Sequence, residues 1–392
     1  MKPFRIEIAQ QALDDLQHRL ANTRWPDAGP VPGWTRGIPK DYLKELAQYW
    51  QHEYDWRAAE ARLNTFDQFI TELDGESVHL LHVRSPEPDA VPLLLTHSWP
   101  GSFVEFVELI GPLTDPRKHG AADAPAFHVV VPSIPGFGFS GPAKDVGWNV
   151  ERIARAWAQL MSQLGYDRYV VQGGDWGMPV SLHVGLADPE HVAGVHVGML
   201  TTFPSPDDPD AFANLDPAEQ AALGQAMAFA EDGFGFQKLQ STRPQTISYA
   251  LTDSPVGQLA WIVEKFKEWS GAVDAPEEVY DRDQLLTNVM IYWFTETAGS
   301  SAQIYYESSH STEDFVRTWG GPWPLSMPLG VANFHNDPNH AVRSWAPGIA
   351  PTLCHWTDFE QGGHFSAMER PADVVTDVRT FVAEQVLKVA TS

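Results

Sequence analysis

The chain of 392 residues lacks several features that would assign a protein quickly to a class. It contains one cysteine, Cys354, so an internal disulfide is excluded, and the apolar residues around this thiol predict that it is buried. No apolar run approaches the length of a membrane span, and the first residues carry charges where a signal peptide would be apolar. These absences favour a soluble, cytoplasmic protein with neither a membrane anchor nor a disulfide framework.

Positive charge is also scarce. Lys and Arg together number 26 against 51 Asp and Glu, which gives a formal net charge of −25. A field of this sign repels nucleic acids and anionic membranes, so neither is an expected partner. What the chain does have is 43% apolar residues, enough for a sizeable core.

The hydrophobic pattern divides the chain into four parts. Residues 1–65 show helical periodicity broken by proline and glycine, whereas residues 66–203 alternate short apolar runs with amphipathic helices. Residues 204–320 are helical without a clear strand, and the alternation resumes in residues 321–392. The predicted strands lie at 69–73, 78–83, 91–96, 127–131, 169–172, 192–197, 328–334 and 352–356. This pattern predicts an α/β fold with a mostly parallel sheet, an N-terminal helical and meandering segment, and a helical lid over the carboxyl ends of the strands.

The strongest local signal is the segment Gly173–Gly177 (GGDWG), which follows an apolar strand and precedes a helix. Small residues two positions before and after Asp175 are typical of a nucleophile elbow, a sharp strand-to-helix turn that exposes its central side chain. No G-x-S-x-G pattern occurs in the chain, so a serine nucleophile of this type is excluded. The simpler alternative is a glycine-rich turn in which Asp175 only caps the helix.

A second signal, the segment His97–Pro100 (HSWP), comes directly after the strand predicted at 91–96. In a fold with a nucleophile elbow, such a loop lies beside the nucleophile, and one of its backbone N–H groups completes an oxyanion hole. We therefore predict that the backbone N–H groups of Trp99 and Trp176 stabilise negative charge at Asp175. An ordinary turn at a strand end is the alternative.

Two further residues would complete a catalytic triad in the chain order that such an elbow uses. His364 lies in a Gly-Gly-His-Phe segment after the last predicted strand. Asp337 follows the strand predicted at 328–334, where an acid would orient the imidazole. Asp358 is the alternative acid, but it lies too close to His364 in the chain to reach across the site easily.

An aspartate nucleophile limits the classes of substrate on which the enzyme can act. A carboxylate attacks an sp³ carbon that bears a strained or good leaving group, and the product is an alkyl-enzyme ester. A histidine oriented by an acid then activates water to hydrolyse this ester. Epoxides and haloalkanes both fit this scheme. An epoxide needs an acid that protonates the opening oxygen, whereas a halide needs N–H donors.

Over its whole length the chain resembles the microsomal-type epoxide hydrolases, a family with the α/β-hydrolase fold and a characteristic N-terminal segment. The segments that carry the resemblance lie at 4–26, 132–140, 173–177, 253–257, 264–266 and 362–365. Unlike the microsomal members, the chain is expected to have no N-terminal anchor. The resemblance implies an α/β-hydrolase fold and the hydrolysis of an epoxide to a vicinal diol.

The resemblance also implies roles for individual residues. Asp175 matches the nucleophile of the family, His364 its base, and Asp337 its orienting acid, for which many members have Glu. Tyr306 matches one of two lid tyrosines that hydrogen-bond the epoxide oxygen.

Two positions depart from the family pattern. The second lid tyrosine falls on Phe236, which cannot donate a hydrogen bond, so Tyr306 acts alone or Tyr305 or Tyr249 substitutes. Ser98 stands where the family has Gly, which predicts backbone strain if this position requires a positive φ.

The expected activity is therefore the hydrolysis of a hydrophobic epoxide with water, without a cofactor or metal. The aromatic side chains expected to line the pocket are Trp99, Trp176, Phe137, Phe236 and Tyr305. A metal site at His335, Asp337 and His340 is disfavoured because their spacing fits neither a helix face nor a known finger pattern. A haloalkane dehalogenase, whose halide-binding position Trp176 also matches, and a relative that only binds a small apolar ligand are the alternatives. A homodimer is left open.

Overall fold

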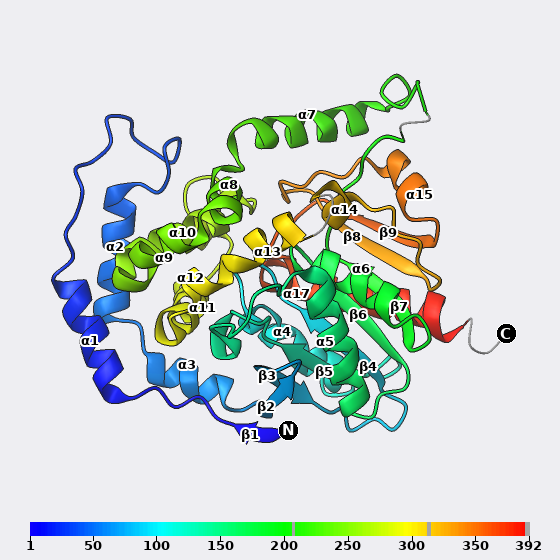
Figure 1. The fold of residues 1–392 in the computed structure, drawn as a ribbon, viewed down its shortest axis with the longest axis horizontal. Helices are drawn as coiled ribbons and strands as arrows, with labels where there is room; N and C mark the ends of the chain where they lie inside the picture. The colour runs from blue at the N-terminus through cyan, green and yellow to red at the C-terminus, as the bar shows by residue number, and fades with distance from the viewer. Residues whose placement is uncertain (206–207, 312–314, 389–392) are drawn as a thin grey trace.

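A nine-stranded sheet forms the centre of the molecule (Figure 1), and the computed structural model describes residues 1–205, 208–311 and 315–388. The strands are β1 (Lys2–Phe4), β2 (Gln68–Leu73), β3 (Glu76–Val83), β4 (Val91–Thr96), β5 (Phe127–Pro132), β6 (Tyr169–Gly173), β7 (Val192–Val197), β8 (Leu329–Phe334) and β9 (Leu353–Phe359). Their order across the sheet is β1-β2-β3-β5-β4-β6-β7-β8-β9. Neighbouring strands run parallel from β5 to β9, and β1, β2 and β3 pair antiparallel. The predicted mostly parallel sheet is confirmed.

The sequence pattern explains which strands form. Every residue of β6 and of β7 is buried, as expected for strands of a parallel sheet that is covered on both faces. The hairpin of β2 and β3 turns through Asp74 and Gly75, whose φ values of 47° and 82° suit the two-residue turns that match strand twist. Strand β1 was not predicted, because its three residues are too short to show a period.

Helices cover both faces of the sheet. Those of the α/β part are α4 (Val107–Thr114), α5 (Val150–Gln163), α6 (Gly177–Ala187), α15 (Ala346–Ile349), α16 (Ser366–Glu369) and α17 (Pro371–Phe381). Helix α4 packs against α17 on one face, and α5 packs against α6 on the other (Figure 1). None of the described helices has the length and apolarity that crossing a membrane would require.

A helical insertion separates β7 from β8 in the chain. It comprises α7 (Pro217–Asp232), α8 (Gly235–Thr242), α9 (Pro244–Asp253), α10 (Pro255–Glu268), α11 (Arg282–Thr295), α12 (Thr297–Ser301), α13 (Gln303–Ser311) and α14 (Phe315–Gly320). Figure 1 shows α7 at the outer edge of this insertion, and none of its residues is buried. We refer to these helices as the lid.

The N-terminal segment braces the lid. Its helices are α1 (Gln10–Ala21), α2 (Lys40–His52) and α3 (Trp56–Leu63). Helices α1 and α2 pack against α10, and α3 packs against α11. The Arg19 guanidinium also donates a hydrogen bond to the carbonyl of Asp253 at the end of α9. The blue segment in Figure 1 therefore holds the lid from its outer side.

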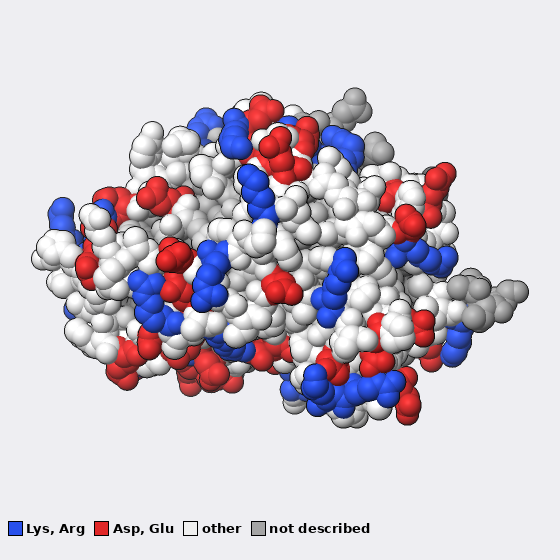
Figure 2. Space-filling view, turned by 90° about the horizontal axis from the view of Figure 1, so that it is seen from below, with Lys and Arg blue, Asp and Glu red and all other residues white. Residues whose placement is uncertain are grey.

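The prediction that Cys354 is buried is wrong. Its thiol is exposed, because Cys354 lies on β9, the outermost strand of the sheet. On the face drawn in Figure 2, most of the Lys and Arg side chains lie close to Asp and Glu.

Candidate active site

Asp175 lies at a sharp turn between β6 and α6. Its φ of 48° is in the left-handed region, which costs free energy for a residue other than glycine and is common at functional sites. The flanking glycines are needed for packing: a Cβ atom on Gly177 would lie 2.1 Å from the carbonyl oxygen of Thr96. The turn thus has the strained geometry predicted for a nucleophile elbow.

The loop after β4 supplies a hydrogen bond to this carboxylate. The backbone N–H of Trp99 donates to Oδ1 of Asp175 at 2.7 Å. The N–H of Trp176, at the first turn of α6, stays a prediction as the second donor. Ser98 does not have a positive φ, so the strain considered for this position is absent. Its hydroxyl instead donates to Oε1 of Glu105 at 2.5 Å, and its N–H donates to the same oxygen at 3.1 Å.

Two acids that the sequence analysis missed flank the site: Glu105, which is buried, and Glu369, which is half-buried. Burial raises the pKa of Glu105 to about 7, although the hydrogen bonds from Ser98 lower it. Burial likewise raises the pKa of Glu369 to about 7, against hydrogen bonds from the Tyr280 hydroxyl and the Phe365 N–H. An isolated Glu in an apolar segment such as residues 103–106 is the signal that could have identified the first of them.

The structure brings Asp175, His364 and Asp337 together. Nε2 of His364 lies 3.4 Å from Oδ2 of Asp175, and its Nδ1 lies 3.1 Å from Oδ2 of Asp337. The N–H of Asn339 donates to Oδ1 of Asp337 at 2.7 Å and fixes the carboxylate. Asp358, the alternative acid, is exposed and pairs with a surface arginine, so it does not reach the imidazole.

The charge of His364 is set by two opposing effects. Burial lowers the pKa of the imidazole, but the charge of Asp337 and the hydrogen bonds to Asp175 and Asp337 outweigh it. The pKa of His364 is therefore raised above its ordinary value, and the imidazolium is favoured while both carboxylates are ionised.

The backbone at His364 is held against the lid. Its N–H donates to the carbonyl oxygen of Trp269 at 2.9 Å, and the two rings meet edge to face at 4.8 Å. A Cβ atom on Gly363 would lie 2.5 Å from this same oxygen, so only glycine allows the approach. Trp269, at the end of α10, was missed because nothing in its sequence context distinguishes it from a core residue.

The lid tyrosine that reaches the site is Tyr305, and the assignment of Tyr306 is not supported. Tyr305 is buried and lines the cavity above Asp175. Tyr306 is 37% exposed and its ring stacks on His310 at 4.1 Å. Successive side chains of a helix point about 100° apart, so a shift of one position turns the hydroxyl away from the site. Tyr249, considered as a substitute, is 71% exposed.

A cavity of about 650 Å³ lies above Asp175 and His364. Apolar side chains from the lid and the sheet edge line most of it, among them Met199, Leu223, Phe229, Phe236 and Trp269. Phe236 stacks flat on Trp99, with ring centroids 5.2 Å apart and planes 1° apart. Of the aromatic side chains expected to line the pocket, Phe236 and Tyr305 do so. Trp99, Trp176 and Phe137 do not, because they are buried, and Phe137 packs against His97 and Tyr292. Two larger grooves, of about 940 and 820 Å³, contain no residue of the Asp175–His364–Asp337 group.

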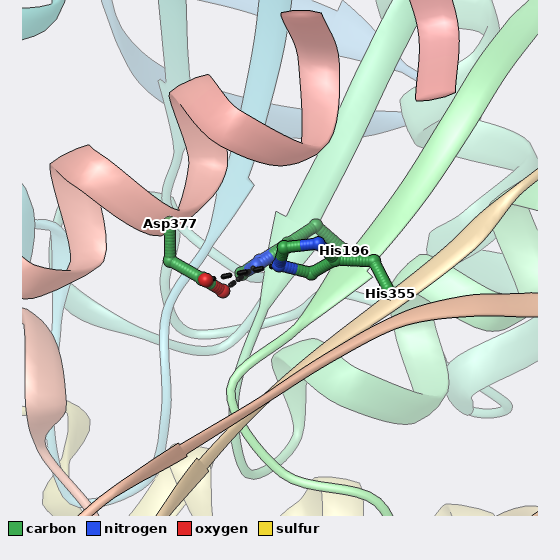
Figure 3. Close-up of side chains that lie close together, drawn as sticks. All are labelled: His196, His355 and Asp377. Atoms are coloured by element: carbon green, nitrogen blue, oxygen red, sulfur yellow. Dashed lines mark hydrogen bonds and ion pairs between the residues drawn. The ribbon is translucent and has the colours of Figure 1, made fainter. Parts of the chain in front are cut away.

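One further cluster of titratable side chains is drawn in Figure 3. Nε2 of His196 lies 2.8 Å from one oxygen of Asp377, and Nε2 of His355 lies 2.9 Å from the other. The Thr357 hydroxyl donates to Asp377 at 2.6 Å. Within the described ranges, these are the His and Asp side chains whose atoms lie close enough to share a metal ion, and His335 forms no such group. The carboxylate already accepts three hydrogen bonds, so we interpret the cluster as a structural link between β7, β9 and α17.

Comparisons with known proteins agree with this geometry. The family described as "Epoxide hydrolase N terminus" matches residues 1–106, and the family described as "alpha/beta hydrolase fold" matches residues 91–266. The predicted α/β-hydrolase fold is confirmed by these matches and by solved structures.

Three proteins illustrate the similarity of this chain to known proteins. A relative in Stigmatella aurantiaca, whose name assigns it provisionally to the epoxide hydrolases, is 46% identical over 96% of this chain and 83% of its own length. The structure of the Aspergillus niger epoxide hydrolase is 32% identical, with a TM-score of 0.86 over 98% of this chain and 96% of its own. That of the juvenile hormone epoxide hydrolase of the silkworm Bombyx mori is 30% identical, with a TM-score of 0.88 over 98% of this chain and 94% of its own.

Proposed function

The chain belongs to the epoxide hydrolase family, and on this premise we propose that it opens a hydrophobic epoxide to a vicinal diol through an ester on Asp175. The observation that carries the proposal is the position of Tyr305 in the same cavity as Asp175 and His364. A carboxylate nucleophile, a water-activating base and a proton donor are the three groups that this reaction needs.

In the first step, a carboxylate oxygen of Asp175 attacks an epoxide carbon. The new C–O ester bond forms while the C–O bond of the strained ring breaks, and the departing oxygen takes the proton of the Tyr305 hydroxyl. His364 begins the cycle as an imidazolium, which the raised pKa supports. Because the ester removes the charge of Asp175, the imidazolium releases its proton, and this proton replaces the one that Tyr305 gave up.

In the second step, the neutral His364 takes a proton from water, and the hydroxide adds to the carbonyl carbon of the ester. The negative charge of the tetrahedral intermediate falls on the oxygen that faces the Trp99 N–H. As the intermediate collapses, the ester C–O bond breaks and the departing alkoxide takes the proton of the added hydroxyl group. The diol then leaves, with Asp175 again a carboxylate and His364 the imidazolium that formed when it took the proton of water. The sum of both steps is epoxide plus water to diol, so the atoms and protons balance.

The lining of the cavity supports an apolar substrate. Aromatic and aliphatic side chains cover most of its surface, and Asp175 and His364 are among the few polar residues that line it. An apolar body would thus be held by the lid while the epoxide faces the carboxylate.

A haloalkane is the second candidate, because the same carboxylate could displace a halide. The indole N–H of Trp176 would be its donor, and it has no partner of good hydrogen-bond geometry among the described residues. Tyr305 and the family membership favour the epoxide.

We would test the proposal with the variant His364→Gln and styrene oxide. Because the base is lost, the ester should persist, and mass spectrometry of the peptides should find one molecule of epoxide added to Asp175. Asp175→Asn in the same background should give no adduct. An adduct with haloalkanes but not with any of a panel of epoxides would refute the proposal.

A cytoplasmic location and a homodimer remain predictions from the sequence. Sedimentation of the purified chain, and fractionation of cells that express it, would decide both.

A further inference from the structure

Two buried polar side chains of the lid reach the loop that carries the Trp99 N–H. Asn288 and Tyr292 lie four residues apart on α11 and so face the same side of this helix. Their exposed fractions are 0% and 1%. Polar groups that are buried this deeply cost free energy unless they are hydrogen-bonded, and both of these are.

Both side chains donate to backbone carbonyls of the loop after β4. Nδ2 of Asn288 lies 2.7 Å from the carbonyl oxygen of Pro100, and the Tyr292 hydroxyl lies 2.5 Å from that of Gly101. The side-chain oxygen of Asn288 also accepts a hydrogen bond from the Ser102 hydroxyl at 2.8 Å. Helix α11 therefore holds three consecutive residues of this loop.

The start of the same loop is fixed by a different group. Oε1 of Glu105 accepts hydrogen bonds from the N–H and the hydroxyl of Ser98, the residue before Trp99. A Cβ atom on Gly101 would lie 1.6 Å from this oxygen, so the loop folds closely around the carboxylate. Trp99 thus lies between one anchor at position 98 and the anchors that the lid provides.

The alignment of the Trp99 N–H matters most in the second step of the proposed reaction. Its partner, Oδ1 of Asp175, loses charge while the ester forms and regains it in the tetrahedral intermediate. A donor that is already in place stabilises such developing charge without reorganisation. A loss of alignment should therefore slow hydrolysis of the ester rather than its formation.

We propose that Asn288 and Tyr292 are positioning residues for hydrolysis of the ester. They hold the residues that follow Trp99 and so keep its N–H aligned with Asp175. The inference rests on the proposed function, because it concerns the second step of that reaction. It gives the lid a role in catalysis besides enclosing the substrate.

Single turnovers of styrene oxide test the proposal with Tyr292→Phe and Asn288→Leu. Each variant should hydrolyse the ester about tenfold more slowly than the wild type, and form it within about twofold of the wild-type rate, so the ester should accumulate. Tyr292→Phe keeps the ring and its packing, and it decides the test if thermal unfolding shows that Asn288→Leu disturbs the fold. Equal losses in both steps, or no loss in either, would overturn the proposal.

A tyrosine that contacts another side of α11 provides the matched control. The Tyr54 hydroxyl, from the N-terminal segment, shares a hydrogen bond with the Thr287 hydroxyl at 2.9 Å. Thr287 directly precedes Asn288, so its side chain points about 100° away. Tyr54→Phe thus loosens the same helix without removing an anchor of the loop, and both steps should stay within about twofold of the wild type. A loss of hydrolysis as large as that of Tyr292→Phe would contradict a specific role for the two anchors.

A measurement without substrate separates this inference from the proposed function. With ¹³C in the carbonyl groups of Ser and ¹⁵N in Trp, amide NMR selects the two Ser-Trp pairs of the chain, 98–99 and 344–345. The Trp99 amide proton should move upfield in Tyr292→Phe as its hydrogen bond lengthens, while that of Trp345 should not move. An unchanged Trp99 signal would overturn the positioning role. A shifted signal, in an enzyme whose wild type forms no ester, would overturn only the proposed function.

Discussion

His364 is the residue whose charge the proposed cycle changes twice. In the free enzyme its pKa is raised by the charge of Asp337 and the hydrogen bonds to Asp175 and Asp337, against the effect of burial. Formation of the ester neutralises Asp175 and removes part of this stabilisation of the imidazolium. The pKa of His364 should therefore be lower in the ester than in the free enzyme.

This shift predicts that the two steps respond differently to pH. Hydrolysis of the ester needs a neutral His364, so its rate should rise about tenfold per pH unit below the pKa of the ester form and then level off. Formation of the ester does not need a neutral imidazole and should change little. Rapid-quench single turnovers should therefore find more ester at low pH. A hydrolysis rate that falls as the pH rises would exclude His364 as the base.

The two adjacent lid tyrosines allow a paired test. Tyr305→Phe should slow ester formation by on the order of 10²-fold, because it removes a donor to the developing negative charge. Tyr306→Phe changes an exposed ring and should stay within about twofold of the wild type. Stopped-flow measurement with an aryl epoxide compares them directly, and the opposite ranking would restore the assignment made from the sequence.

Tyr305 and Tyr306 show the limit of what the sequence could predict about single residues. Asp175, His364 and Asp337 could be located because each lies directly after a strand, and the ends of parallel strands meet at one edge of the sheet. Tyr305 lies on helix α13, where an error of one position rotates the side chain by about 100°. Its assignment depends on how the lid packs, which no local pattern determines.

At the scale of secondary-structure elements, Asp377 joins three of them. His196 belongs to β7, His355 to β9 and Asp377 to α17 (Figure 3). Burial raises the pKa of Asp377, but the hydrogen bonds from both imidazoles hold it well below its usual range. These partners lie 181 and 22 residues away in the chain, which is why the sequence alone gave no reason to select Asp377.

The link predicts a pH-dependent loss of stability. Asp377→Asn should lower the free energy of unfolding by about 3 kcal/mol near neutral pH. The reason is that the hydrogen-bond donors around position 377, from His196, His355 and Thr357, lose the carboxylate that accepts from all three. A depressed pKa contributes stability above the unfolded value of about 4 and loses it as the pH falls. The difference in free energy of unfolding between Asp377→Asn and the wild type, measured with urea, should therefore shrink as the pH falls. Thr376→Ala, at the exposed neighbouring position of α17, is the control, and a constant difference would contradict the link.

The strands and the lid were predictable to different degrees. The strands β4 to β7 consist mostly of apolar residues, so their positions follow from the sequence. The short helices α8, α9 and α12 have too few turns for a reliable period, and they pack against one another as well as against the core. The sequence therefore predicted that a helical lid exists but not how its helices are arranged.

At the scale of the whole molecule, the site is assembled from segments that are far apart in the chain. The sheet edge supplies Asp175, Asp337 and His364, and the lid supplies Tyr305 and Trp269. The N-terminal helices α1 and α2 pack on α10, and Trp269 directly follows the last residue of that helix. The position of the lid over the nucleophile is thus secured from its outer side.

The outer wall of the cavity is formed in part by α7, and this predicts where substrate size is selected. Ala226 and Ala230 lie one turn apart and both line the cavity, whereas Ala228 does not line it and lies about 200° around the helix from Ala226. Ala226→Phe should fill the cavity far from Asp175. We expect kcat/KM for trans-stilbene oxide to fall on the order of tenfold, and that for 1,2-epoxybutane to stay within about twofold. Ala228→Phe adds the same ring on the other face and should affect neither substrate. Equal losses for both epoxides would mean that the substitution disturbs the lid as a whole, and unchanged kcat/KM values for both would mean that large substrates do not reach α7.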